Sequence, residues 1–389
     1  MKNKPHDIPF NKPCIGAAEM AAVQAALEQG ILRGDGPISK RIEAAMASWL
    51  DIPHVFFTTS CTHALEMAMI ALDIGPGDEV IMPSFTFVSS ANAVVLRGAK
   101  PVFAEIDAST LNIDPLDIAK RITPNTKAIV PVHYAGVACD MDPIMAIAKQ
   151  HNLYVIEDAA QGFDAYYKNR PLGTLGDIGC FSFHDTKNIT SGEGGAFLTG
   201  NEAIAHRAEL VREKGTNRSA FFRGEIAKYN WVSQGSSYIQ SDILAALLEA
   251  QIARKDEIKE NRKRVWEAYY NALRPLSEAG QIILPVIPDY ASSNYHIFFF
   301  RVTSLSKRDQ IILALKNAGI QATFHYVPLH SSPFGVEQLG CTDSLPITQM
   351  CSESLIRLPL YPQLAPQAAE LSQRICDIVG TQLTEEVVL

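Results

Sequence analysis

The sequence predicts an α/β protein with a large domain built on a mostly parallel mixed sheet and a smaller C-terminal α+β domain. Short apolar runs recur about 20 to 27 residues apart, which is the spacing of βαβ units. Runs that are short and apolar throughout are typical of parallel strands covered by helices on both faces. We expect strands at residues 79–82, 101–106, 128–132 and 154–156, and two more at residues 180–183 and 196–199.

Helical patterns occupy the N-terminal part and separate the two expected domains. We expect helices at residues 17–29, through Ile42, Met46 and Leu50, and at residues 62–72. A long helical stretch at residues 241–273 is expected to be broken by Pro275. The domain boundary is placed within it, which gives a large domain at 1–255 and a small domain at 256–389. A strand at 296–302, a helix at 307–318 and a further segment at 322–326 predict the α+β character of the small domain.

Composition and charge exclude several classes of function. The chain has 389 residues, a formal charge of −8 and 47% hydrophobic residues, which argues against a nucleic-acid partner. No run of about 18 apolar residues is present and residues 1–7 lack a secretory pattern, so we expect no membrane partner. The seven cysteines form no Cys-x-x-Cys pair, which favours reduced thiols in the cytoplasm over disulfides or zinc. No metal site is expected, because the histidines and cysteines lack ligand-like spacing.

Two residues carry the chemistry that the sequence indicates. Lys187 lies in a short loop between the last two expected strands, and Asp158 follows the strand at 154–156. Carboxyl ends of parallel strands border the ligand crevice of α/β sheets, so the carboxylate of Asp158 is expected to point into it. A lysine that forms a Schiff base and a carboxylate that keeps a pyridinium nitrogen protonated are what pyridoxal phosphate (PLP) requires. Each residue alone has a plainer interpretation, as a surface lysine or a helix cap.

Further residues are candidates to hold the cofactor. The segment 59–62 precedes a helix, so backbone N–H groups and the Thr62 hydroxyl are expected to bind phosphate at the helix N-terminus. Ser182 is a second candidate for a phosphate contact. Phe87, just after a strand, is placed to cover the ring, although by spacing alone it is equally a core residue.

Five ordered motifs, at residues 59–65, 77–83, 157–161, 182–187 and 192–195, resemble the DegT/StrS-type sugar-nucleotide aminotransferases, and the similarity extends through residues 324–330 and 358–362. The resemblance implies a fold-type-I PLP-dependent transferase that is a homodimer with shared active sites. It also implies that Lys187 bears the cofactor, Asp158 pairs with its ring nitrogen, Gln161 contacts its phenolic oxygen, Phe87 and Ala160 flank the ring, and Cys61 N–H, Thr62 and Ser182 hold the phosphate.

Two departures from the family pattern are visible. Cys61 stands where the family usually has glycine, and Gly235-Ser236-Ser237 replaces a Gly-Tyr-Asn whose Asn contacts the neighbouring subunit's phosphate. We therefore assign no residue to that contact. Residues 132–139, 212–219 and 235–238 resemble the subgroup of TDP-4-keto-6-deoxyglucose transaminases, in which both departures recur.

The subgroup implies a specific reaction, in which L-glutamate aminates dTDP-4-dehydro-6-deoxy-D-glucose to dTDP-4-amino-4,6-dideoxy-D-galactose. The candidate substrate contacts are Lys214, His325, Tyr326 and His330, although loop or core packing explains the histidines nearly as well. The alternatives are amination of a 3-keto or other keto-sugar nucleotide, a PLP-dependent sugar dehydratase, and a non-catalytic regulator. The dehydratase relatives replace the lysine with histidine, so Lys187 favours transamination.

Overall fold

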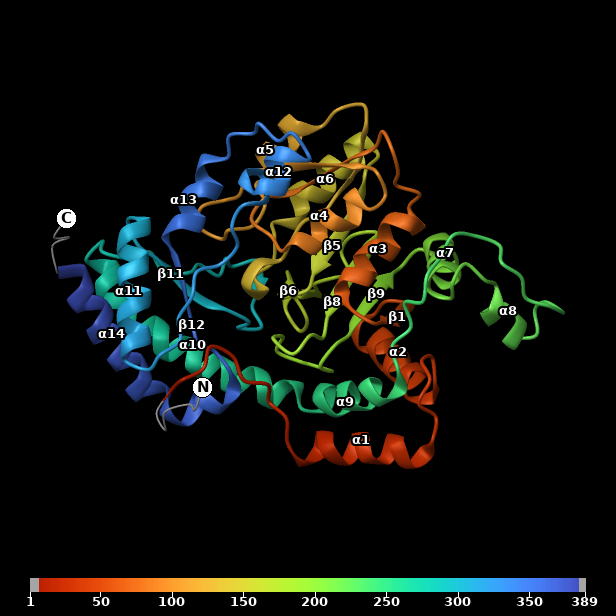
Figure 1. Cartoon of the computed structure of the whole chain (residues 1–389), viewed down its shortest axis with the longest axis horizontal. Coiled ribbons are helices and arrows are strands. Elements are labelled where there is room, and N and C mark those ends of the chain that lie inside the picture. The colour runs from red at the N-terminus through yellow and green to blue at the C-terminus, as the bar shows by residue number, and fades with distance from the viewer. Residues whose placement is uncertain (1–6, 385–389) are drawn as a thin grey trace.

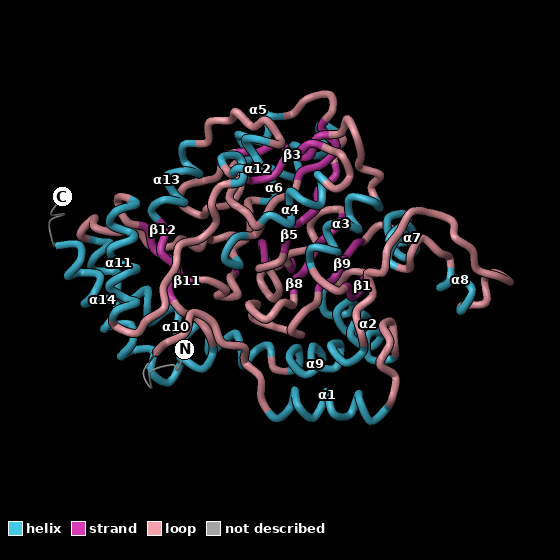
Figure 2. Tube along the Cα trace, viewed as in Figure 1, coloured by secondary structure: helices cyan, strands magenta, loops and turns pink. Residues whose placement is uncertain are grey.

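A seven-stranded sheet forms the centre of the molecule in the computed structural model, which describes residues 7–384 (Figures 1 and 2). The strand order is β1-β9-β8-β5-β4-β2-β3, and all neighbours are parallel except β9, which runs antiparallel to β8 and β1. The predicted α/β class and the mixed, mostly parallel sheet are thus confirmed. The strands are β1 (His54–Thr58), β2 (Glu79–Pro83), β3 (Lys100–Ala104), β4 (Thr126–Ile129), β5 (Tyr154–Ala159), β8 (Ile178–Ser182) and β9 (Gly195–Thr199).

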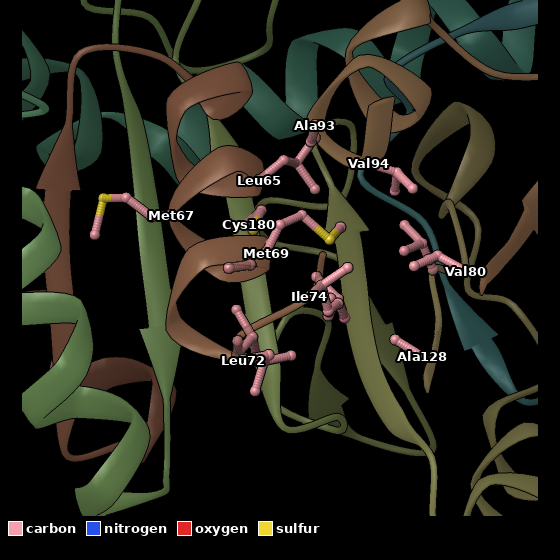
Figure 3. Packing of buried hydrophobic residues seen from close by; sticks show 14 of the residues in the cluster. Leu65, Met67, Met69, Leu72, Ile74, Val80, Ala93, Val94, Ala128 and Cys180 are labelled. Carbon is pink, nitrogen blue, oxygen red and sulfur yellow. The ribbon is translucent and has the colours of Figure 1, made fainter. Parts of the chain in front are cut away.

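Helices cover both faces of this sheet, as the apolar strands require. In β2, Val80 and Met82 belong to one buried cluster and Ile81 to another, because successive side chains point to opposite faces. Figure 3 shows the first cluster, in which Leu65 and Met69 lie on the side of their helix that faces Ala93, Val94 and Val80. The helices on this face are α3 (Cys61–Ala71), α4 (Val88–Val95) and α7 (Glu202–Arg212); those on the other are α5 (Pro115–Arg121) and α6 (Met141–His151).

Three further helices pack at the β1 end of the sheet. They are α1 (Ala17–Gln29), α2 (Pro37–Leu50) and α9 (Asp242–Ala253), and α1 and α9 lie side by side in Figure 1. The buried carboxylate of Asp242 accepts hydrogen bonds from three backbone N–H groups at the start of α2, those of Gly36, Ile38 and Ser39. Because these donors have no partner within the helix, Asp242 fixes where α2 begins.

The C-terminal part has its own buried cluster, formed chiefly by residues 265–379. Its elements are α10 (Lys255–Glu278), β11 (Phe298–Arg301), α11 (Leu305–Asn317), η2 (Leu329–Ser331), α12 (Pro333–Glu337), α13 (Pro346–Ser354), β12 (Leu355–Leu358), η3 (Pro362–Gln367) and α14 (Ala368–Thr384). β11 pairs with β12, whereas the expected segment 322–326 pairs only through Thr323. The division of the chain at residue 255 stays a prediction, although α9 ends one residue before Arg254 and α10 begins one residue after it.

The expected helix break at Pro275 is wrong. The long helical stretch is instead interrupted at Arg254, and α10 continues through Pro275 to Glu278. Pro275 lies in the last turn, where the carbonyl still accepts from Ala279 N–H at 3.0 Å. A proline this near the end removes one backbone hydrogen bond and leaves the earlier turns intact.

Small elements connect the main layers. The short strands β6 (Tyr166–Tyr167), β7 (Arg170–Pro171) and β10 (Ala291–Ser292) form a separate sheet, and η1 (Tyr134–Gly136) follows β4. In the segment at residues 213–241, the part around α8 (Arg218–Phe222) extends away from the rest of the molecule (Figure 1), whereas Tyr238 and Gln240 are buried against it. Among the described residues, no helix is both long enough and apolar enough to cross a membrane.

Candidate active site

A cavity of about 510 Å³ lies where the carboxyl ends of β2, β5 and β8 face the C-terminal part of the chain. Most of the residues singled out in the sequence line it: Cys61, Thr62, Phe87, Asp158, Ala160, Gln161, Ser182, Lys187, His325 and Tyr326. These residues come from five separate segments, so the fold brings them together from positions up to 265 apart in the chain.

Asp158 is held in one orientation at the end of β5. One carboxylate oxygen accepts a hydrogen bond from Ser90 Oγ at 2.7 Å, and the other accepts from Ala160 N–H at 3.1 Å. The side chain is buried, yet it lines the cavity. A fixed, buried carboxylate of this kind stabilises a protonated ring nitrogen placed against it.

The neighbouring Glu157 points to the other side of β5, where it holds the loop at residues 173–176 in place. Its carboxylate accepts from the backbone N–H groups of Gly173, Leu175 and Gly176, and it contacts His133 Nε2 at 2.9 Å. Because Glu157 and Asp158 alternate across the strand, one carboxylate serves the core and the other faces the cavity.

Lys187 enters the cavity from the loop between β8 and β9. Its backbone N–H donates to His184 O at 2.9 Å, which closes a tight turn. Burial lowers the pKa of the Lys187 amine below its ordinary value of 10.5; Cys61 and Asp158 oppose this shift, and the Arg357 guanidinium reinforces it. An amine with a lowered pKa is neutral for a larger fraction of the time and is therefore a better nucleophile.

The first turn of α3 borders the same cavity. Ser60 is the N-cap, and its hydroxyl accepts from His63 N–H at 3.1 Å. The N–H groups of Cys61 and Thr62 have no acceptor within the helix, and they lie at its positive end. Thr62 Oγ1 contacts Ser89 Oγ at 2.8 Å, which adds hydroxyl groups beside these amides. The arrangement suits an anion such as a phosphate.

The cysteine at position 61 does not obstruct this turn, because its side chain points into the core. Cys61 Sγ lies 3.6 Å from the carbonyl oxygen of Cys180 on β8, and burial raises the pKa of the thiol well above 9.0. The close backbone contact to this turn comes instead from β9. A Cβ placed on Gly195 at the start of β9 would lie 2.4 Å from Cys61 N.

Aromatic side chains form another part of the cavity wall. Gln161 donates to Tyr326 Oη at 2.9 Å, and the Tyr326 ring stacks on His325 with centroids 3.6 Å apart. Tyr134 Oη lies 2.7 Å from His325 Nδ1. Burial, with the Arg357 and Lys187 charges, lowers the pKa of His325 well below 6.5, so this imidazole is neutral at ordinary pH.

Comparisons with known proteins agree with this geometry. Residues 13–379 match the DegT/DnrJ/EryC1/StrS aminotransferase family. The chain belongs to this family. It is 35% identical over 389 residues to the spore coat polysaccharide biosynthesis protein SpsC of Bacillus subtilis, covering 97% of this chain and 99% of SpsC.

Solved structures of similar proteins show the same fold. An aminotransferase from Psychrobacter cryohalolentis superimposes with a TM-score of 0.91 at 29% identity, covering 98% of this chain and 100% of that one. The putative sugar aminotransferase Spr1654 from Streptococcus pneumoniae, in its PLP form, gives a TM-score of 0.88 at 28% identity over 97% and 100%. The predictions of a fold-type-I transferase, of an aminotransferase and of PLP as its cofactor are confirmed.

The residues of this family member fit PLP. The cavity combines a buried amine, a buried carboxylate and a helix N-terminus, which suit an aldehyde, a ring nitrogen and a phosphate respectively. Phe87, the N-cap residue of α4, lines the cavity and is 59% exposed, whereas Phe85 is buried in the core. Of the two aromatic residues, only Phe87 is therefore placed to cover a bound ring.

Two of the candidate substrate contacts lie outside this cavity. His330 is buried in η2, where its Nδ1 lies 2.7 Å from Ser84 Oγ. Lys214 lies at the base of the 213–241 segment with a left-handed backbone (φ 65°), and its amine is 3.9 Å from Glu213. Within a single chain, neither side chain borders the space that Lys187 and Asp158 share.

Arg262 and Arg357 also line the cavity, and the sequence analysis missed both. Arg357 interrupts the apolar strand β12, and Arg262 lies among Ile258 and Val265 on the buried face of α10. A cation on an apolar strand or on the apolar face of a helix was the available signal, since such charges are rarely buried without a partner.

Proposed function

We propose that this chain is a sugar-nucleotide aminotransferase that uses L-glutamate to aminate dTDP-4-dehydro-6-deoxy-D-glucose, with dTDP-4-amino-4,6-dideoxy-D-galactose as product. The observation that carries the proposal is the shared cavity, in which Lys187, Asp158 and the first turn of α3 meet. The family and the names of SpsC and Spr1654 support a sugar substrate. The motifs of the TDP-4-keto-6-deoxyglucose transaminase subgroup support the particular sugar.

The side chains have distinct roles in this proposal. Lys187 carries the cofactor, Asp158 holds the proton on its ring nitrogen, and Gln161 contacts its phenolic oxygen. Phe87 and Ala160 flank the ring. The amide of Cys61 and the hydroxyls of Thr62 and Ser182 hold the phosphate. The hydrogen bonds of Asp158 to Ser90 and Ala160 support its role, because they hold the carboxylate in one orientation at the cavity.

Lys187 also moves the proton on which transamination depends. The bound cofactor supplies an electron-withdrawing ring that acidifies the α-carbon of the amino donor. With cofactor and donor bound, the free Lys187 amine would take that proton and return it at the cofactor's C4′ position. Burial keeps this amine partly neutral, which a general base requires.

Amination of a 3-keto sugar nucleotide is the nearest alternative, since the keto position rests on resemblance alone. A sugar dehydratase or a non-catalytic regulator is less well supported, because Lys187 and Asp158 are both present. His325 and Tyr326, which line the same cavity, are proposed to contact the nucleotide sugar.

The proposal includes a homodimer, which explains why Lys214 lies outside the cavity of a single chain. The projecting part of segment 213–241 exposes Phe222, Tyr229 and Trp231, the last with 82% of its surface accessible. Such side chains are typical of an interface rather than of a free surface. Lys214 at the base of this segment, and His330, are kept as candidate substrate contacts of the assembled enzyme, which we expect in the cytoplasm. Light scattering on the purified protein tests the dimer.

Replacing Lys187 tests the assignment of the cofactor. Lys187→Ala is expected to abolish turnover and the visible absorbance of the cofactor–lysine linkage. Lys263→Ala, which removes a surface lysine of α10, is the matched control. Retention of both turnover and absorbance in Lys187→Ala would defeat the assignment.

A panel of substrates tests the reaction. The holoenzyme is incubated with glutamate and a set of 3-keto and 4-keto sugar nucleotides carrying TDP or UDP, and the products are examined by NMR. A 4-amino-4,6-dideoxygalactose product from the TDP sugar supports the proposal. A 3-amino product, or turnover only with UDP sugars, contradicts it.

A further inference from the structure

The guanidinium of Arg357 is a half-buried cation in the wall of the cavity. Its Nε atom is inaccessible to solvent and forms no hydrogen bond, and within residues 7–384 the guanidinium has no ion-pair partner. Burying a charge in this way is costly unless a ligand supplies the opposite charge. Burial lowers the pKa of Arg357 from 12.5, which is the direction expected of a cation removed from water.

The side chain is nevertheless held in position. The backbone of Arg357 pairs with Phe299 of β11 on one side and with Thr323 on the other. The ring of Phe10, which reaches the cavity from the N-terminal segment, lies 4.8 Å from the guanidinium carbon. A guanidinium stacked on an aromatic ring keeps its edge of N–H donors free for a planar anion.

Arg262 differs from Arg357 in this respect. It lines the same cavity, but its Nε and Nη2 atoms donate to the carbonyl oxygens of Tyr295 and His296 at 3.1 and 2.6 Å. These bonds fix the segment before β11 and leave fewer donors for a ligand. Arg357 is therefore the cation of this wall whose donors are uncommitted.

We propose that Arg357 binds the carboxylate of the amino donor and orients the donor toward Lys187. This inference rests on the proposed function, in which an amino acid supplies nitrogen. An α-amino acid carries its carboxylate on the reacting carbon, so its anchor must lie near the amine of Lys187. The Arg357 charge is close enough to act on that amine. The phosphate site at α3 already has its own donors, which leaves Arg357 for a second anion.

The guanidinium also suits a carboxylate better than a single point charge would. Its parallel N–H groups match the two oxygens of a carboxylate and fix the plane of the ligand as well as its distance. The uncharged rings of Tyr326 and His325 line the same wall. An amino acid bound there is oriented by one strong contact within a largely neutral environment.

The test uses the holoenzyme and measures the half-reaction with L-glutamate alone, followed by the cofactor absorbance. Arg357→Gln is expected to raise the glutamate concentration at half-maximal rate about 10- to 100-fold, the range for a lost hydrogen-bonded charge contact. Arg357→Lys is expected to fall in between, because it keeps charge but loses the two parallel donors. Arg264→Gln, on the solvent side of α10, is the matched control and is expected to stay within about twofold of the wild type.

A binding measurement without chemistry completes the design. Maleate, an unreactive dicarboxylate, is titrated into the holoenzyme by calorimetry, and the same loss of affinity is expected in Arg357→Gln. In Arg357→Gln, the Michaelis constant for the keto-sugar nucleotide, measured with the aminated enzyme, is expected to remain within twofold of the wild-type value.

Equal affinity of wild type and Arg357→Gln for glutamate and maleate would overturn the inference. So would a weakened keto-sugar interaction with glutamate binding unchanged, which would assign Arg357 to the sugar nucleotide. If Arg357→Gln does not fold, the maleate affinity of Arg357→Lys decides in the same way. The half-reaction and the maleate titration contain no sugar, so failure of the proposed sugar reaction appears separately, as a wild type that accepts glutamate but aminates no keto sugar.

Discussion

Gly195 offers a quantitative test of how the sheet positions the phosphate-binding turn. A Cβ at this position would lie 2.4 Å from Cys61 N, 2.4 Å from Ser60 C and 2.5 Å from Ser60 O. All three atoms belong to the backbone, so no rotamer change relieves the overlap. Ordinary contacts begin at 3.4 Å, and the first turn of α3 must therefore move by about 1 Å relative to β9. Overpacking of this kind costs about 1–3 kcal/mol.

The displacement falls on the amides that we propose hold the phosphate. We expect Gly195→Ala to lower the free energy of unfolding by about 2 kcal/mol and to weaken PLP binding at least tenfold, or about 1.4 kcal/mol. Urea denaturation measures the first quantity, and equilibrium dialysis with cofactor absorbance measures the second. Gly200→Ala is the control, because a Cβ there meets no atom within 4 Å and the backbone needs no positive φ. The reasoning fails if Gly195→Ala retains wild-type cofactor affinity.

Three other perturbations act on different parts of the site. Glu157→Gln places an amide against three backbone N–H donors and disturbs the contact with His133. We expect the free energy of unfolding, measured by urea denaturation, to fall by about 2–4 kcal/mol. An unchanged midpoint would contradict this. Burial lowers the pKa of His296 well below 6.5, so the unfolded chain binds a proton that the folded chain does not. Stability is therefore expected to fall as the pH drops below 6.5, by about 1 kcal/mol at pH 5.5 from this residue, and His296→Gln should show a correspondingly shallower pH dependence. Phe10→Leu removes the ring beside Arg357 and is expected to raise the apparent glutamate constant about threefold without changing that for the keto sugar; an equal effect on both substrates would count against a specific role.

Local patterns were sufficient for elements whose character is set by neighbouring residues. The helix expected at residues 17–29 is α1 with identical bounds, because its small and apolar residues are followed by Gly30 in a left-handed conformation. The strand β1 was missed because its five residues follow a helix and a proline, and its partner β9 lies about 140 residues later. Pairing over such a distance stabilises a strand that the local sequence does not distinguish.

The candidate site divides in the same way. Asp158 lies at the carboxyl end of a strand, where ligands bind, and the needs of a PLP site predicted that Lys187 shares its location. His330 was a candidate on the basis of residue type, yet packing places it against Ser84. A cation within the apolar strand β12 was a signal for Arg357, but only the packing of that strand beside the cavity shows what the charge faces.

Charge in the cavity explains why these basic residues are compatible with an acidic protein. The chain carries a formal charge of −8, but Lys187, Arg262 and Arg357 line the cavity against Asp158 and Glu193, and Glu193 is largely exposed to solvent. Buried cations in excess of buried carboxylates destabilise a protein that binds nothing. The same excess favours ligands that bring a phosphate, a carboxylate or a pyrophosphate, and it strengthens each contact where water is excluded. The positive charge of this cavity therefore favours binding of the phosphate of the proposed cofactor, the carboxylate of the amino donor and the pyrophosphate of the sugar nucleotide.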